Sequence, residues 1–167
     1  MLKIAPKTKG KIAAGMRVAI VASRYNARYV NSMLRAAKAE LVEAKVAAEV
    51  VRVPGAFEIP AVASVLAKRL AKPVDAILCL GVILRGETTH AEHIGQAVTA
   101  ALAQLQLKHS LPVIHEVLLL ENMEQAKQRC LDSGQNRGIE AARTAIEMTR
   151  VMRRLGAKNL ADRTVAP

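Results

Sequence analysis

The side chains best suited to chemistry stand together at residues 81–90, which end in Thr88, Thr89 and His90. They follow an apolar run at 75–84 and precede a segment whose apolar residues recur with a helical period. This order predicts a strand, a glycine turn and the N-terminus of a helix. At the carboxyl edge of a parallel sheet, such a junction offers unpaired backbone N–H groups to an anion. We therefore predict an anion-binding site here.

Gly81 and Gly86 have the spacing of the P-loop glycines, but Glu87 stands where that loop needs a Lys. The missing cation excludes a nucleoside triphosphatase. What remains is a turn in which backbone N–H groups and the hydroxyls of Thr88 and Thr89 hold a single anion. The alternative is that one of these two threonines only caps the helix.

His90 and His93 lie one helical turn apart, but the motif lacks a third ligand and the Glu of zinc-binding helices. We therefore predict no metal site. Histidine exchanges a proton near neutral pH, so His90 is a candidate general acid and base. The alternative is an ordinary surface histidine.

Four apolar runs predict strands, and each is followed by a segment of helical period. The runs are residues 16–23, 46–53, 75–84 and 112–120. Asn26, Asn122 and Asn136 are placed to cap three of the helices. Pro60 fits only the first turn of the second helix, on whose apolar face Leu70 is also expected. Alternating units with short connections predict an α/β fold with a parallel sheet and helices on both faces.

In a doubly wound sheet, the ends of the first and third strands flank a crevice in which ligands bind. This brings residues 23–26 and 54–58 beside 86–90. Tyr25 and Phe57 follow two of these strands in a chain with only three aromatic residues. The alternative is that each aromatic covers the core from a loop. Arg129 and Arg137 each follow a helical segment or a break, and their guanidinium groups suit phosphate, although a solvated Arg at a helix end is the commoner case.

The chain has 167 residues, 51% of them hydrophobic, which is the size of one domain. We expect a basic arm at 1–15, the domain at 16–155 and a frayed tail at 156–167. The net charge of +11 indicates acidic partners, but basic residues gather near both ends and are not interleaved with aromatics. A phosphate-bearing small molecule is therefore expected rather than nucleic acid.

Cys79 and Cys130 form no spacing motif, and no secretory segment is visible, so we expect a reducing, cytoplasmic setting. No apolar run approaches the roughly 20 residues that span a bilayer, so no membrane partner is expected.

Several motifs resemble, in order and spacing, the successive signatures of the lumazine synthase family. They are residues 23–26, 53–60, 80–90, 124–126, 136–142 and 145–148. The resemblance covers residues 16–152. It implies a flavodoxin-like three-layer αβα subunit with a four-stranded parallel sheet, and homopentamers that in some members close into larger shells. It also implies an N-terminal arm that pairs with the adjacent sheet, and an active site shared between neighbours.

The activity implied by the resemblance is the penultimate step of riboflavin biosynthesis. In that step 5-amino-6-(D-ribitylamino)uracil condenses with 3,4-dihydroxy-2-butanone 4-phosphate to give 6,7-dimethyl-8-ribityllumazine, phosphate and water. The family uses no metal and no organic cofactor. Its reaction passes through a Schiff base, elimination of phosphate, ring closure and dehydration.

The resemblance also implies roles for single residues. Tyr25 matches the aromatic that stacks on the pyrimidine, and His90 matches the proposed proton-transfer residue. Arg129 matches the Arg that binds phosphate. The remaining matches are Ala56, Phe57 and Glu58 around the ribityl chain and ring, Val82 and Ile83 at the backbone edge that reads the uracil, and Gly86, Glu87 and Thr88 in the phosphate-holding turn.

Three departures from the family pattern affect the expected substrate site. His115 replaces a Phe that reaches a neighbour's substrate, residues 131–135 lack a common Lys, and Arg137 replaces another Lys. An Arg keeps the charge but presents a planar fork. These departures leave open a catalytically weak flavin- or pteridine-binding relative as the alternative.

Overall fold

The computed structural model describes residues 15–164, with side chains as far as Gly156. The predicted N-terminal arm at 1–15 therefore lies outside the described residues, apart from Gly15. The arm, domain and tail boundaries otherwise stay predictions. No helix within 15–164 is long and apolar enough to cross a membrane.

Four parallel strands form one sheet in the order β2-β1-β3-β4. They are β1 (Arg17–Ser23), β2 (Ala47–Val53), β3 (Ala76–Leu84) and β4 (Val113–Leu120). Each strand coincides with a predicted apolar run, so the four-stranded parallel sheet is confirmed. The chain turns outward from β1 to β2 and then crosses back to β3 on the other side of β1. The order therefore reverses between β1 and β3, and the crevice expected at a switch point lies at their carboxyl ends.

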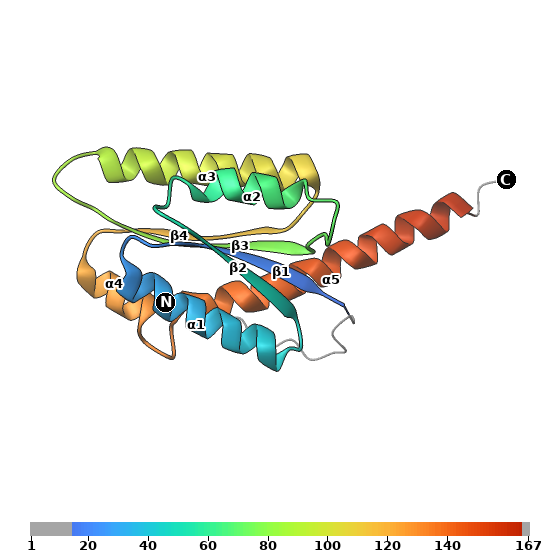
Figure 1. Cartoon of the computed structure of the whole chain (residues 1–167), viewed down its shortest axis with the longest axis horizontal. Helices are drawn as coiled ribbons and strands as arrows, with labels where there is room; N and C mark the ends of the chain where they lie inside the picture. The colour runs from blue at the N-terminus through green and yellow to red at the C-terminus, as the bar shows by residue number, and fades with distance from the viewer. Residues whose placement is uncertain (1–14, 165–167) are drawn as a thin grey trace.

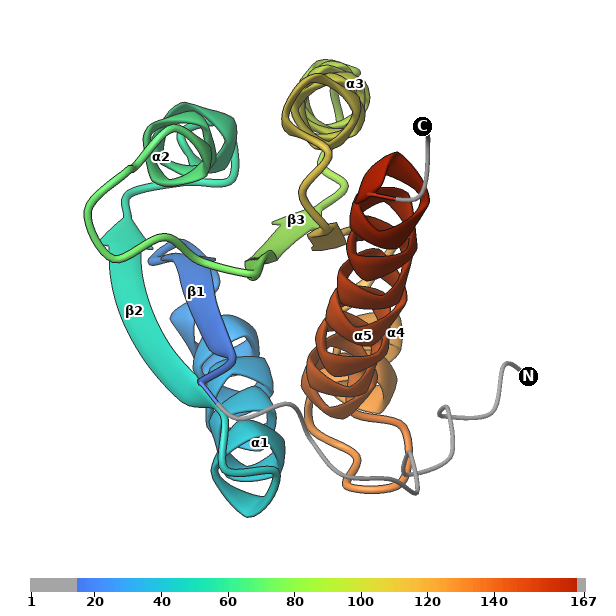
Figure 2. The ribbon, with the colours of Figure 1, turned by 90° about the vertical axis from the view of Figure 1, so that its right-hand side faces the viewer.

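Five helices cover the two faces of the sheet. They are α1 (Ala27–Glu43), α2 (Ile59–Ala67), α3 (His90–His109), α4 (Met123–Cys130) and α5 (Arg137–Thr164). Helices α2 and α3 lie on one face, and α1, α4 and α5 lie on the other, as the two perpendicular views show (Figure 1, Figure 2). The flavodoxin-like αβα arrangement is thereby confirmed.

The core consists of two apolar layers, one on each face of the sheet. Ile20 and Leu78 face α1 and α5, whereas Val21 and Ile77 face α2 and α3. This alternation follows from the two-residue period of a strand. Strand β3 is buried from Ala76 to Ile83, which explains its continuous apolar run.

The polar caps explain where two helices begin. The side chain of Asn122 accepts a hydrogen bond from Gln125 N at 3.0 Å, and that of Asn136 accepts one from Gly138 N at 2.9 Å. Asn26 stands at the N-cap position of α1 as expected, but its side chain does not cap the helix. It adopts the left-handed conformation with φ 54° and makes no side-chain cap bond.

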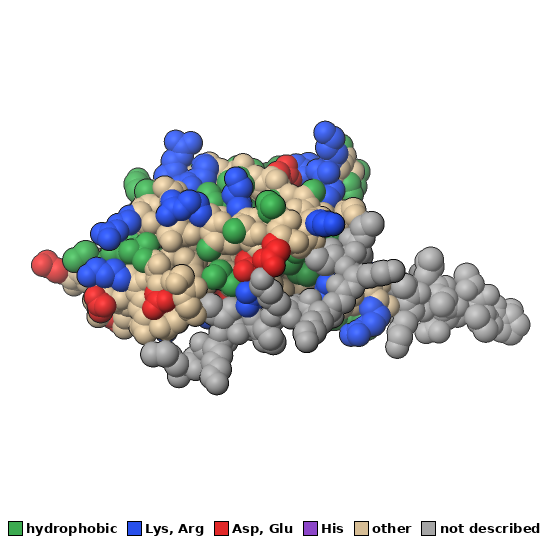
Figure 3. Space-filling view, turned by 90° about the horizontal axis from the view of Figure 1, so that it is seen from below, with side chains coloured by type: hydrophobic (Ala, Val, Ile, Leu, Met, Phe, Trp, Pro, Cys, Tyr) green, Lys and Arg blue, Asp and Glu red, His purple; other side chains and the backbone are tan. Residues whose placement is uncertain are grey.

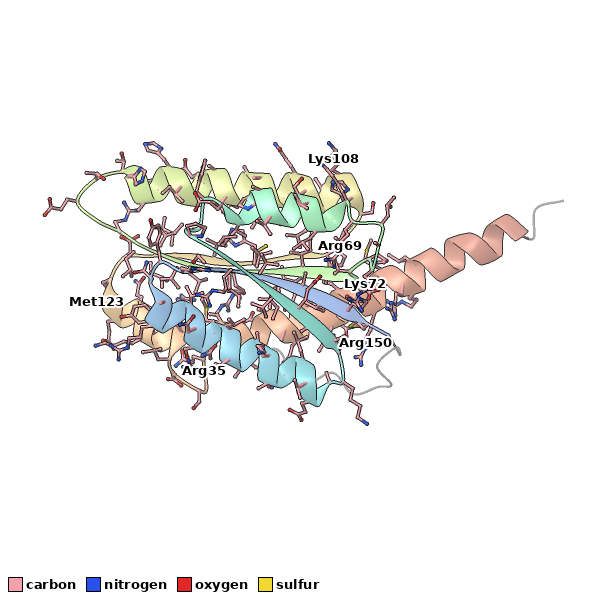
Figure 4. The ribbon with its side chains drawn as sticks, viewed as in Figure 1. Arg35, Arg69, Lys72, Lys108, Met123 and Arg150 are labelled. Carbon is pink, nitrogen blue, oxygen red and sulfur yellow. The ribbon has the colours of Figure 1, made fainter. Side chains whose placement is uncertain are left out.

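Two helix ends also differ from the prediction. Helix α2 stops at Ala67, so Leu70 lies beyond it with 94% exposure. There Arg69 donates to Lys72 O and pairs with Glu49 of β2, which turns the chain back toward the sheet (Figure 4).

Helix α5 continues to Thr164 and extends past the sheet, so the tail predicted from Gly156 is helical over 156–164 (Figure 1). A single Gly costs about 1 kcal/mol in a helix, which is too little to end one that is otherwise stable.

Candidate active site

A cavity of about 660 Å³ opens at the carboxyl edge of the sheet, where β1, β2 and β3 end. Its walls come from the loops after these strands and from the start of α3. It is lined by Tyr25, Asn26, Gly55, Ala56, Phe57, Glu58, Val82, Ile83, Leu84, His90 and Ile94. The crevice predicted at the switch point is therefore present, and the three predicted loops contribute to it.

The loops after β1 and β2 are held together across Gly55. Tyr25 N donates to Pro54 O at 3.0 Å, and Gly55 N donates to the carboxylate of Glu58 at 2.8 Å. A Cβ atom at Gly55 would lie 2.8 Å from that carboxylate and 3.0 Å from the Tyr25 ring. The absence of a side chain here lets the aromatic ring and the carboxylate approach the same point.

The mouth and the floor of the cavity differ in exposure. Tyr25 and Phe57 are 70% and 60% exposed, so neither is a lid buried on the core. Ala56, Val82 and Ile83 are buried and form an apolar floor. A flat ligand entering the cavity would meet aromatic rings at the mouth and β3 beneath them.

Asn26 lines the cavity, as expected for residues 23–26. Its side-chain nitrogen donates to Val82 O at 2.7 Å, which fastens the loop after β1 to β3. Asn tolerates the left-handed conformation that this geometry requires. An Asn directly after an aromatic at a strand end is the signal that could have suggested this role.

The predicted anion turn connects β3 to α3. Gly86, Glu87 and Thr88 are exposed and stand outside the cavity lining. The Thr88 hydroxyl accepts only a long hydrogen bond, 3.4 Å from His90 N, and the side chain of Thr89 caps nothing. The alternative that these threonines serve mainly as caps has little support in this geometry.

Arg85 fastens the same turn to its neighbours. Its backbone N donates to Leu120 O at 2.9 Å, and its guanidinium lies 2.7 Å from the Glu121 carboxylate and 3.7 Å from that of Glu92. The turn is thus linked to the end of β4 and to the first turn of α3. His90, at the first position of α3, is exposed and contributes to the cavity wall.

His115 lies on β4, away from the cavity lining. Its Nε2 is 3.0 Å from the Thr99 hydroxyl, which itself donates to Gly95 O at 2.8 Å. Because a hydroxyl has one proton to donate, Nε2 must carry the proton of the imidazole. Burial lowers the pKa of His115, which favours this neutral form.

The two predicted phosphate-binding arginines do not reach this cavity within one chain. Arg129 is exposed on the last turn of α4, on the opposite face of the sheet from α3. Arg137 at the start of α5 has its guanidinium taken up by Glu116 and Glu140. The guanidinium of Arg137 is therefore not free to bind a phosphate, contrary to the prediction from the sequence.

Residues 15–153 match the family model for 6,7-dimethyl-8-ribityllumazine synthase. The chain belongs to the 6,7-dimethyl-8-ribityllumazine synthase family. It is accordingly an enzyme, a transferase, and membership of this family places it in riboflavin biosynthesis. The match covers every strand of the sheet and all the residues that line the cavity.

Three of the family-like sequence motifs meet at the cavity. The motifs around Tyr25, Phe57 and Ile83 come from three separate stretches of the sequence and meet at one edge of the lumazine synthase sheet. Within residues 15–156, no group of three or more His, Cys, Asp or Glu side chains is placed to hold a metal ion.

Proposed function

We propose that the enzyme condenses 5-amino-6-(D-ribitylamino)uracil with 3,4-dihydroxy-2-butanone 4-phosphate to give 6,7-dimethyl-8-ribityllumazine, phosphate and water. The observation that supports this most directly is the cavity of about 660 Å³, which has aromatic residues at its mouth and His90 in its wall. Its volume lies within the range of roughly 300–1,000 Å³ typical of small-molecule sites.

The first substrate binds in the cavity itself. The Tyr25 ring stacks on the pyrimidine, and the backbone of Val82 and Ile83 reads the uracil edge. Ala56, Phe57 and Glu58 hold the ribityl chain. Because Gly55 N and the Glu58 carboxylate already bind each other at 2.8 Å, this turn is formed before substrate arrives. Such preorganisation lowers the entropic cost of binding.

The second substrate places its phosphate on the turn of Gly86, Glu87 and Thr88 at the N-terminus of α3. Backbone N–H groups and the helix dipole favour an anion there. The amine of the pyrimidine attacks the ketone and water leaves, forming the Schiff base. Phosphate is then eliminated, the ring closes and a second water departs. His90 transfers protons at these steps from the cavity wall.

The site is completed by a second copy of the chain in a homopentamer. Arg129 and His115 stand outside the cavity of their own subunit, and both are candidates to reach the cavity of a neighbour. Arg129 then binds the phosphate on the turn of Gly86 and Thr88. We also propose a cytoplasmic location, which is consistent with the buried free thiols of Cys79 and Cys130.

The activity is tested by mixing the two substrates at neutral pH with and without the protein. The absorbance of the lumazine product should grow faster with protein than in the blank, in which the uncatalysed reaction proceeds on its own. A rate equal to the blank would contradict the proposal.

A second candidate is a relative that binds flavin or pteridine and turns over little. It is favoured by the polar pair of His115 and Thr99, which gives β4 a hydrogen-bonding surface where the family pattern has an apolar ring. Tight binding of riboflavin together with a rate equal to the blank would support this candidate.

Nucleic-acid binding has less support, because Lys and Arg are scattered among acidic and apolar side chains on the described part of the face seen in Figure 3.

A further inference from the structure

Every nitrogen of the Arg137 guanidinium is engaged by a carboxylate. Its Nε and Nη2 each lie 3.1 Å from one oxygen of Glu116, and Nη1 donates to Glu140. The side chains of Arg137 and Glu116 are only 18% and 7% exposed. A two-point pair of this kind fixes the Arg fork in one orientation. Arg137 therefore cannot turn toward a ligand without leaving a buried carboxylate unpaired.

A second cation, Arg129, acts on the same carboxylate through its charge. Burial raises the pKa of Glu116, and Arg137 and, to a smaller extent, Arg129 oppose this shift by their charge. Arg129 is nevertheless in no ion pair: among the residues that the structure describes, no carboxylate lies within pairing distance of its guanidinium. Arg137, and not Arg129, therefore pairs with the Glu116 carboxylate.

Asn136 fixes the spacing between these two arginines. Its side-chain nitrogen donates to Cys130 O at the end of α4, and its oxygen accepts from Gly138 N at the start of α5. The end of α4, which carries Arg129, is thereby tied to the start of α5, which carries Arg137. We therefore expect Arg129 to compete for the Glu116 carboxylate when Arg137 is lost.

We propose that Arg137 is a positioning residue that occupies both oxygens of Glu116 and so keeps the guanidinium of Arg129 free to bind the substrate phosphate. The inference rests on the proposed role of Arg129. If Arg137 lost its charge, Glu116 would be a buried and unpaired carboxylate, and such a group is costly. It would attract Arg129 and draw it away from the phosphate.

A double-mutant cycle tests this competition. Arg137→Met should raise the KM for the phosphate-bearing substrate about ten- to a hundredfold, as expected for loss of a charge-assisted contact. Adding Glu116→Gln to that variant removes the competing carboxylate and should restore the KM to within about twofold of the wild type. The inhibition constant of inorganic phosphate should follow the same pattern, whereas the KM for the pyrimidine should not change.

The double variant alone separates positioning from direct binding. If Arg137 contacted phosphate itself, Arg137→Met/Glu116→Gln would keep the full loss of affinity, and the inference would be overturned. This comparison holds even if Arg137→Met fails to fold, because the double variant no longer buries the unpaired Glu116 carboxylate and is compared with Glu116→Gln. Glu140, which also loses Arg137, is 21% exposed and so keeps access to water.

A matched control lies on the same helix. Arg143 pairs with Glu40 through two contacts of 2.9 and 3.1 Å, and the two side chains are 17% and 15% exposed. Arg143→Met should destabilise the protein to a similar degree but leave the KM for the phosphate-bearing substrate unchanged. A rise in that KM would mean that it reports only the stability of α5, which would overturn the inference.

Arg129→Ala separates this inference from the proposed function. If Arg129→Ala leaves phosphate affinity unchanged, the assignment of Arg129 is wrong and the inference falls with it. If Arg129→Ala weakens phosphate binding but the cycle shows no restoration, only the role given to Arg137 is wrong.

Discussion

His90 stands at the first position of α3 and contributes its side chain to the cavity wall. General acid and base catalysis contributes about 10²–10⁴-fold to a rate, so His90→Ala should lower kcat by that amount without abolishing activity. Both KM values should stay nearly constant in steady-state assays. His93→Ala is the matched control, because His93 is exposed one turn along α3 and outside the cavity lining. Equal effects of the two changes would contradict proton transfer by His90.

Gly55 separates the Tyr25 ring from the Glu58 carboxylate. The Cβ of Gly55→Ala would lie 2.8 Å from the carboxylate oxygen and 3.0 Å from the ring, so both side chains must move. We expect a rise in the KM for the pyrimidine substrate of about tenfold, the size of one lost contact in the binding site. The KM for the phosphate-bearing substrate and the melting temperature should change little. A shift in the phosphate KM alone would show that this turn does not hold the pyrimidine.

The residues of the cavity were predictable where they follow a strand directly. Tyr25 and Phe57 stand in the loops after β1 and β2, and His90 begins the helix after β3, so all three meet where the strands end at one edge of a parallel sheet. The contacts that Asn26 and Arg137 make were not predictable in this way. Their partners, Val82 and Glu116, are 56 and 21 residues away, and only the folded sheet brings them together.

At the scale of elements, α1 and α5 approach each other closely at Gly138. A Cβ at Gly138 would lie 2.0 Å from Met33 O, a backbone atom that no rotamer change can move. Gly138→Ala should therefore force the two helices apart and lower the free energy of unfolding by at least the roughly 1–3 kcal/mol typical of overpacking. Chemical denaturation followed by circular dichroism measures the change.

Gly156 provides the control on the same helix. A Cβ there meets nothing within 4 Å, so Gly156→Ala should stabilise α5 by up to about 1 kcal/mol through its higher helix propensity. The two Gly→Ala changes thus have opposite expected signs. Stabilisation by Gly138→Ala would mean that the α1–α5 contact is not as close as described.

The strands were predictable as elements because burial on both faces makes each a continuous apolar run, as in β3. The helix ends were not, because they depend on contacts outside the helix. After α2, Arg69 turns the chain by bonding to Lys72 O and to Glu49 of β2. The helical period of the apolar residues does not predict either contact.

At the scale of the whole molecule, one chain contains only part of the proposed site. His90 and the anion turn stand on one side of the sheet, whereas Arg129 is on α4 across it. If neighbouring copies share each site, a subunit with His90→Ala still offers an intact Arg129, and a subunit with Arg129→Ala still offers an intact His90.

Mixed assemblies of these two variants should therefore regain activity. When the variants are co-expressed with different affinity tags and purified through both, some interfaces join a wild-type His90 to a wild-type Arg129. Random mixing of equal amounts makes about a quarter of the interfaces of this kind, so the mixture should recover up to about a quarter of the wild-type rate if each site acts independently. A rate that equals the mean of the two separate variants would mean that both residues act within one chain. If light scattering gave the mass of a single chain, no neighbour could supply Arg129 and the shared site would be excluded. The cavity of one chain is lined by no residue of α4.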